Sequence, residues 1–177
     1  MFSDPLKNLK MFGVWETDIV ADLGAGTGFY SIFAAKIANM GKVYAVELSR
    51  DFLETIQNKI KEAKLANIEC LWGDVERLGG TKIGDGVVDK VIASNVLFQL
   101  ENKKEFIKEV KRILKDKGKV LFIDWNSSSP LASKGQLLSK NEVRTMFVDE
   151  GFILDREIDA GLEHYGMILT KLASHKE

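Results

Sequence analysis

Short apolar runs alternate with amphipathic stretches along most of this chain. Each run is about four to eight residues long, the length of a buried strand, and turn residues separate the runs. The runs therefore predict strands at residues 19–23, 43–46, 68–72, 87–93, 119–124, 152–158 and 164–171.

The stretches between these runs have helical spacing, because apolar residues recur every three or four positions. They predict helices at residues 29–39 and 102–115, and another that begins near Lys140 and closes at Gly151. Asp116-Lys117-Gly118 is expected to end the second of these. A further helix, capped by Ser49, is expected to bury one apolar face, made of Phe52, Leu53, Ile56, Ile60 and Ala63.

Strands that alternate with helices indicate an α/β fold with a doubly wound, mostly parallel sheet and right-handed crossovers. The last two predicted strands leave no room for a helix between them, so they are expected to pair as an antiparallel hairpin. The length of 177 residues fits a single domain. We expect a short helical segment at residues 1–18, followed by a core at residues 19–171.

A glycine-rich turn, residues 22–28, joins the first strand to the first helix. Ligands bind at the carboxyl ends of strands in such sheets, and glycines let the backbone approach them closely. A dinucleotide fingerprint would need a third glycine where Phe29 stands, which counts against NAD or FAD. A tight turn with no ligand is the competing interpretation of this motif alone.

Polar groups at the ends of successive strands favour a ligand that contains adenosine. Glu47 ends the second strand, where an acidic residue can hold ribose hydroxyls. Asp74 follows the third strand and can accept a hydrogen bond from an adenine amino group. Leu48 and Val75 can sandwich the adenine ring, and Asn95 lies just past the fourth strand.

Taken together, these segments resemble the class I S-adenosylmethionine-dependent methyltransferases, in particular their quinone-biosynthesis-like branch. The resemblance runs from about Val20 to Lys171. The segments that match the family's motifs, in chain order, are Asp22–Gly28, Val43–Glu47, Gly73–Val75, Asp89–Asn95 and Leu114–Val120. In that family a seventh strand is inserted antiparallel between the fifth and the sixth, which agrees with the predicted hairpin.

The resemblance implies S-adenosylmethionine as the cofactor and assigns roles to particular residues. Glu47 would hold the ribose diol, and Asp74 the adenine amine. Asp22 would help to hold the amino group of the methionine part, and Asn95 would complete that end. The turn passing beneath the methionine part would be formed by Gly24, Ala25, Gly26 and Gly28.

Sheet geometry indicates which residues could meet the methyl acceptor, because the ends of strands four to six and the start of strand seven share one edge. His164 is the best single candidate for a general base there. Asp124 could be a base or a loop cap. Tyr165 is a tentative catalytic candidate, although a pocket wall is its simpler role. The segment from Asn95 onward departs from the Asn-Pro-Pro-Tyr pattern of adenine and glutamine N-methyltransferases.

Composition and charge narrow the function further. The formal net charge is −1, which gives no strong attraction to nucleic acid. A basic stretch follows Lys103, but its charges can pair with Glu105 and Glu109 at helical spacing. Cys70 is the only cysteine, and with two histidines the chain has no predicted metal centre. The start does not resemble a signal peptide, and no apolar run is long enough to cross a bilayer. We therefore expect a cytoplasmic protein.

The function predicted from sequence is transfer of a methyl group to a small or lipid-like, partly apolar acceptor. The alternatives are a protein or ribosomal RNA methyltransferase and a non-catalytic subunit that binds the cofactor. The first 18 residues leave three arrangements open for the site: it is open, it is covered by Phe12 and Trp15, or a homodimer completes it.

Overall fold

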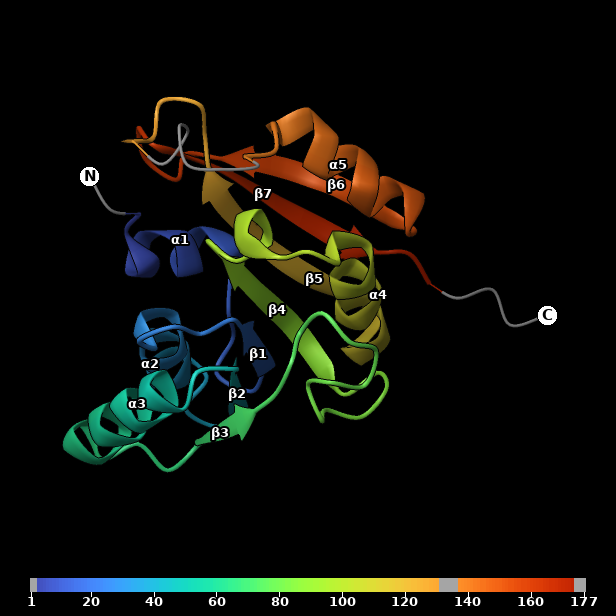
Figure 1. Ribbon diagram of the computed structural model, residues 1–177. Coiled ribbons are helices and arrows are strands. Elements are labelled where there is room, and N and C mark those ends of the chain that lie inside the picture. Colours follow the sequence, from blue (N-terminus) through green and yellow to red (C-terminus); the bar gives the residue numbers. More distant parts are fainter. Residues whose placement is uncertain (1–2, 131–136, 174–177) are drawn as a thin grey trace.

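The computed structural model describes residues 3–130 and 137–173, and these contain one seven-stranded sheet in the order β3-β2-β1-β4-β5-β7-β6 (Figure 1). The first five strands are parallel, and β7 pairs antiparallel with both β5 and β6. The predicted fold class and the predicted hairpin are therefore confirmed. The strands are β1 (Ile19–Leu23), β2 (Lys42–Glu47), β3 (Ile68–Trp72), β4 (Val88–Ser94), β5 (Leu114–Trp125), β6 (Phe152–Ile158) and β7 (His164–Lys171).

Helices cover both faces of the sheet (Figure 1). One face carries α1 (Pro5–Phe12), α2 (Phe29–Ile37) and α3 (Arg50–Ala63), and the other carries α4 (Lys103–Ile113) and α5 (Lys140–Asp149). A short 3₁₀ helix, η1 (Leu97–Gln99), follows β4. Two separate apolar cores result, one on each side of the sheet.

Local sequence explains where several helices begin and which face they bury. Ser49 caps α3, as predicted, by accepting a hydrogen bond from the Phe52 N–H at 3.4 Å. Ser139 and Glu142 form a capping box at the start of α5. The apolar face of α4 is fully buried, and it consists of Phe106, Ile107, Val110 and Ile113.

Several details of the predicted elements are wrong. The helix predicted at residues 29–39 ends at Ile37, and Asp116-Lys117-Gly118, expected to end the helix at residues 102–115, lies inside β5. The helix expected to continue to Lys115 ends at Ile113, because Leu114 is already extended and pairs with Val88 as the first residue of β5. Phe52, expected on the buried face of α3, keeps 44% of its surface exposed. It lies in the first turn of α3, whereas Leu53 and Ile56 of the same predicted face are buried.

The basic stretch on α4 forms ion pairs at helical spacing, as predicted. The Lys108 ammonium lies 2.6 Å from the Glu105 carboxylate, and the Arg112 guanidinium lies 2.7 Å from that of Glu109. Glu109 is completely buried and also accepts hydrogen bonds from the Thr81 side chain and backbone. The helices within residues 3–130 and 137–173 include none that could cross a membrane.

Strand order reverses at β1, which has β2 on one side and β4 on the other. Because these strands are parallel, their carboxyl ends meet at one edge of the sheet. The glycine turn after β1 and the segment after β4 diverge there to opposite faces of the sheet. A crevice at this point is the position where open α/β sheets bind ligands.

Candidate functional site

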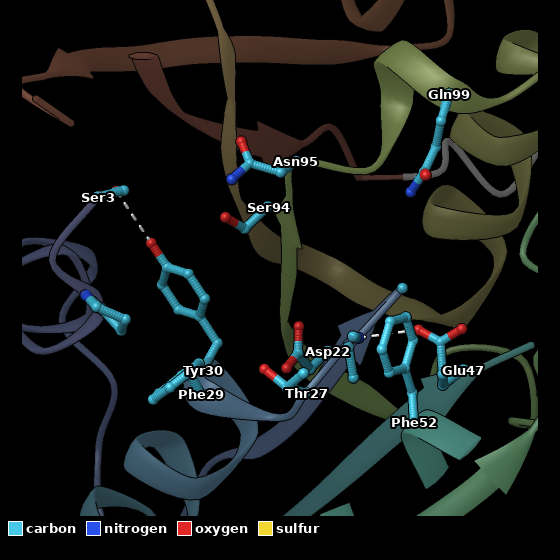
Figure 2. A pocket seen from close by; sticks show the side chains of 14 residues that line it. Ser3, Asp22, Thr27, Phe29, Tyr30, Glu47, Phe52, Ser94, Asn95 and Gln99 are labelled. Atoms are coloured by element: carbon cyan, nitrogen blue, oxygen red, sulfur yellow. Dashed lines mark hydrogen bonds between the residues drawn. The ribbon is translucent and has the colours of Figure 1, made fainter. Parts of the chain in front are cut away.

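A cavity of about 610 Å³ opens at this edge, and we call it the main cavity. Figure 2 shows Glu47 and Phe52 at one end, Ser3 and Tyr30 at the other, and Asp22, Ser94 and Asn95 between them. Its lining residues come from the N-terminal segment, the glycine turn, and the ends of β2 and β4; they are Ser3, Pro5, Asp22, Gly24, Ala25, Gly26, Thr27, Phe29, Tyr30, Glu47, Phe52, Ser94, Asn95 and Gln99.

The glycine turn needs glycine for two different reasons. Gly24 has a φ of +70°, and a Cβ there would lie 2.6 Å from Cγ2 of Val96. Gly26 has a φ of +54°, but a Cβ there would meet no atom within 4 Å and would enter the open space of the main cavity. Gly28 caps α2 with a φ of +81° and does not line the cavity.

Glu47 connects the glycine turn to the end of β2. Its Oε2 accepts a hydrogen bond from the Gly26 N–H at 2.8 Å. Its Oε1 accepts from the Leu48 N–H at 2.8 Å and from the Ser49 N–H at 2.9 Å. Three N–H groups leave one acceptor position of the carboxylate free for a ligand. Glu47 therefore fixes the shape of the turn while it lines the cavity.

Asp22 is a buried acid in the floor of the main cavity, with 2% of its surface exposed. Burial raises the pKa of its carboxyl group to about 6, although a 2.5 Å hydrogen bond from the Ser31 hydroxyl acts in the opposite direction. A carboxylate in such a place is stabilised by a cationic ligand, which would lower its pKa again.

A second cavity of about 400 Å³, the side cavity, adjoins the first and shares Gly24, Glu47 and Gln99 with it. Leu48, Asp74 and Val75 line the side cavity, so the groups predicted to surround adenine do lie together. Asp74 Oδ1 accepts from the Glu76 N–H at 3.0 Å, and its Oδ2 lies 3.1 Å from Nε of Arg77.

Asn95 lies between β4 and η1, with a left-handed φ of +55°. Its N–H donates to the Ile123 carbonyl at 2.8 Å, which ties the end of β4 to β5. Its side-chain Oδ1 is buried and has no hydrogen-bond partner among residues 3–130 and 137–173. A buried acceptor without a partner is costly, and a donor on a bound ligand would satisfy it.

Several lining residues were not predicted from the sequence. Phe29 and Tyr30 are the first residues of α2. Because they directly follow the glycine turn, their position in the sequence could have identified them as cavity-lining residues. Ser94 ends β4, one residue before the predicted Asn95. Ser3 and Pro5 offered no signal, because only packing brings residues so far from the turn to the cavity.

Neither Phe12 nor Trp15, the residues considered as a cover for the site, lines the main cavity. Phe12 is 4% exposed and lies in the core beneath α1, whereas Trp15 is 71% exposed. Ser3 and Pro5 line the cavity from this part of the chain instead. A helix of eight residues buries its last turn in the core and thereby leaves the residues at its start beside the site.

The three predicted catalytic residues lie at the junction of β5 and β7 and line neither cavity. His164 is 5% exposed and packs against Trp125, with ring centroids 4.0 Å apart. Both of its ring nitrogens are buried and find no hydrogen-bond partner in the part of the chain that the structure describes, and burial lowers its pKa. The Tyr165 hydroxyl donates to the Leu138 carbonyl at 3.2 Å, and burial raises the pKa of this phenol.

Asp124 acts as a cap for two backbone segments. Its carboxylate accepts hydrogen bonds from the Trp125 N–H at 2.9 Å and from the Phe98 N–H at 3.1 Å. Burial nevertheless raises the pKa of this group to about 6. The loop-cap role that the sequence left open therefore has a structural basis. The alternative role of Asp124 as a general base stays a prediction.

Asp124 gives the protein a specific dependence of stability on pH. A carboxyl group whose pKa rises from 3.8 to about 6 on folding stabilises the protein fully below about pH 4, and this contribution is lost as the pH rises to about 6. The expected decrease in the free energy of unfolding is about 3 kcal/mol. Urea unfolding of the wild type and of Asp124→Asn at pH 4 and pH 7 measures it, and the free energy of unfolding should fall less steeply in the variant. An equal fall of the free energy of unfolding in the wild type and in Asp124→Asn would contradict the raised pKa of Asp124.

Comparison with known proteins identifies the family. A family model described as "Methyltransferase domain" matches residues 16–163. The chain belongs to this methyltransferase family. It is a class I enzyme that depends on S-adenosylmethionine, as its fold, motifs and relatives agree.

Curated relatives of this methyltransferase have several named activities. "Probable cobalt-precorrin-6B C(15)-methyltransferase (decarboxylating)" of Methanosarcina acetivorans is 26% identical over 77% of this chain and 85% of that protein. A "Ubiquinone/menaquinone biosynthesis C-methyltransferase" of Blochmanniella pennsylvanica is 31% identical over 66% of this chain. The match spans only 47% of that second relative, about half its length.

A solved structure superimposes on nearly the full length of this chain. The S-adenosylmethionine-dependent methyltransferase from Aquifex aeolicus superimposes with a TM-score of 0.85 at 27% identity, and the match covers 97% of this chain and 91% of the other. The similarity therefore extends beyond the glycine turn to the whole sheet and its helices.

The residues of the two cavities fit S-adenosylmethionine. A Cβ at residue 26 would occupy the space above the turn, so the glycine keeps a cradle open for a ligand. The unpartnered Oδ1 of Asn95 needs a donor, and the buried Asp22 carboxylate needs a positive charge. The cofactor's ammonium and sulfonium groups can meet these two needs.

Proposed function

We propose that this methyltransferase acts on a small or lipid-like, partly apolar acceptor. The observation that supports this proposal is an apolar rim on the main cavity, made of Phe29 and Phe52. Their side chains are 60% and 44% exposed although they lie beside a deep and partly polar site. Apolar side chains exposed around a concave site are typical of surfaces that bind apolar ligand parts.

The cofactor-binding roles are part of the same proposal. Glu47, at the end of the main cavity next to the side cavity, binds the ribose hydroxyls through its free acceptor position. Asp74 accepts the adenine amino group in the side cavity, where Leu48 and Val75 contact the ring. Asp22 pairs with the ammonium of the methionine part, which is the positive charge that its buried carboxylate requires.

The protein's main contribution to the reaction is alignment. When bound, S-adenosylmethionine supplies an electrophilic methyl group on a sulfonium. The turn from Gly24 to Gly26 supports the methionine part from below, and Asn95 orients it through its backbone and amide. Holding two reactants in line contributes on the order of 7–11 kcal/mol in favourable cases, so a small domain with few polar groups can be an effective catalyst.

His164 remains our candidate for a general base, should the acceptor carry a proton that must be removed. Its lowered pKa keeps the imidazole neutral near pH 7, and a neutral ring nitrogen without a partner can accept a proton. Asp124 and Tyr165 are in register with each other on the β5–β7 pair, next to the pair formed by Trp125 and His164. The homodimer and the cytoplasmic location stay predictions.

Isotope transfer tests the proposed acceptor class. The protein is incubated with methyl-labelled cofactor and, separately, with a neutral hydroquinone carrying an isoprenoid tail, with total RNA, and with a ribosomal protein fraction. We expect label in the organic extract of the first reaction. Label confined to RNA or protein would support the macromolecular alternative instead, against which the paired charges of α4 argue.

A further inference from the structure

The structure assigns Tyr30 as a positioning residue that holds the N-terminal segment, residues 3–12, against the main cavity. We propose that Tyr30, Asn8 and Ser3 form a latch, and that closure of this latch and binding of the cofactor reinforce each other. This inference rests on the cofactor site of the proposed function, but it does not depend on which acceptor is methylated.

The latch is a closed set of hydrogen bonds between distant parts of the chain. Asn8 Nδ2 donates to the Tyr30 hydroxyl oxygen at 2.8 Å and to the Ser3 hydroxyl oxygen at 2.6 Å. The two hydroxyl groups lie 3.3 Å apart, and Figure 2 shows the Tyr30 ring directed from α2 toward Ser3. Asn8 is completely buried, and Tyr30 is 9% exposed. Burial also raises the Tyr30 pKa, which keeps the phenol neutral.

The two halves of the N-terminal segment are attached in different ways. Leu9 and Phe12 bury the second half in the apolar core against α2. The first half has no comparable apolar anchor, since Leu6 is 37% exposed. A helix of eight residues is not stable by itself in water. The position of the first half therefore depends on the latch, together with an exposed ion pair between Lys7 and Asp159 at 2.8 Å.

The latch determines part of the cavity wall. Ser3 and Pro5 line the main cavity, and Tyr30 lines it beside them. If the latch opens, this wall moves away and the cavity gains solvent access at the end opposite Glu47. A cofactor that contacts the wall binds the closed form more tightly, so binding must favour closure by the same factor.

Asn8 allows a clean test, because it belongs to the latch but lines neither cavity. We would prepare Asn8→Leu, Tyr30→Phe and the double variant, and measure S-adenosylhomocysteine affinity by calorimetry. Each single variant should weaken binding about tenfold, and the double variant should be no weaker than either, because one broken bond already opens the latch. Hydrogen exchange of the ligand-free variants should increase at residues 3–8 and not in the central strands.

Tyr44→Phe is the matched control, since it removes a tyrosine hydroxyl from β2 outside both cavities. It should change neither the affinity for S-adenosylhomocysteine nor hydrogen exchange at residues 3–8. A folded Asn8→Leu variant with wild-type affinity, or unchanged exchange at residues 3–8, would overturn the inference. Asn8→Ala, which removes the same amide donor outside both cavities, serves the same purpose if Asn8→Leu does not fold. A failure of the proposed acceptor class would leave both readouts untouched, so the two failures are distinguishable.

Discussion

Replacing Glu47 by alanine is expected to weaken S-adenosylhomocysteine binding at least about 100-fold. The change removes the proposed partner of the ribose hydroxyls and also the acceptor of the Gly26, Leu48 and Ser49 N–H groups. The glycine turn would then lose its attachment to β2, so the cavity would change its shape. The cavity would also lose the negative charge of the Glu47 carboxylate. Calorimetric titration of the folded variant measures the effect.

Glu69→Ala provides the control for that experiment. Glu69 lies on the neighbouring strand β3, where its carboxylate is 2.6 Å from the Lys42 ammonium and 47% exposed. An exposed ion pair of this kind contributes at most about 1 kcal/mol to stability. We expect unchanged affinity in Glu69→Ala. Wild-type affinity in a folded Glu47→Ala variant would show that the ribose is held elsewhere.

Gly26→Ala is expected to abolish most cofactor binding while the protein remains folded. The added Cβ meets no protein atom within 4 Å and enters the main cavity. A ligand that contacts the turn would therefore collide with it, and we expect affinity to fall by at least about tenfold, the equivalent of about 1.4 kcal/mol. The positive φ adds a folding cost of about 1–2 kcal/mol for any residue with a Cβ.

Gly13→Ala separates these two effects. Gly13 caps the end of α1 with a φ of +71°, and a Cβ there also meets nothing within 4 Å. Its folding cost should match that of Gly26→Ala, because the backbone strain is of the same kind, but it lies outside both cavities. Urea unfolding should report similar losses, and calorimetry should report weakened binding only for Gly26→Ala. Equal affinities in the two variants would remove the turn from the cofactor site.

The clustering of the residues proposed to bind the cofactor could be predicted from the sequence, because these residues lie at strand ends. Parallel strands place their carboxyl ends at one edge, so Asp22, Glu47, Asp74 and Asn95 had to lie near one another once the alternation of strands and helices was recognised. Each residue lies within a few positions of an apolar run. Their proximity follows from local pattern and one topological rule.

The acceptor half could not be predicted in the same way. His164 and Asp124 lie at the expected edge of the sheet, yet side-chain packing turns them toward Trp125 and toward backbone N–H groups, and they line neither cavity. Phe52 has the helical spacing of a buried residue, but it lines the main cavity and is 44% exposed. Periodicity identifies a face of a helix, and it does not show where the opposing surface ends.

The sequence by itself determined the fold class, the antiparallel placement of the last strand, the family and the cofactor, because each depends on short-range patterns in a fixed order. Only the tertiary structure decided which part of the first 18 residues reaches the site. Phe12 is buried, Trp15 is exposed, and Ser3 and Pro5 line the cavity. The position of Ser3 and Pro5 involves a hydrogen bond between Asn8 and Tyr30, 22 positions apart, and no periodic signal in a single chain encodes such a contact.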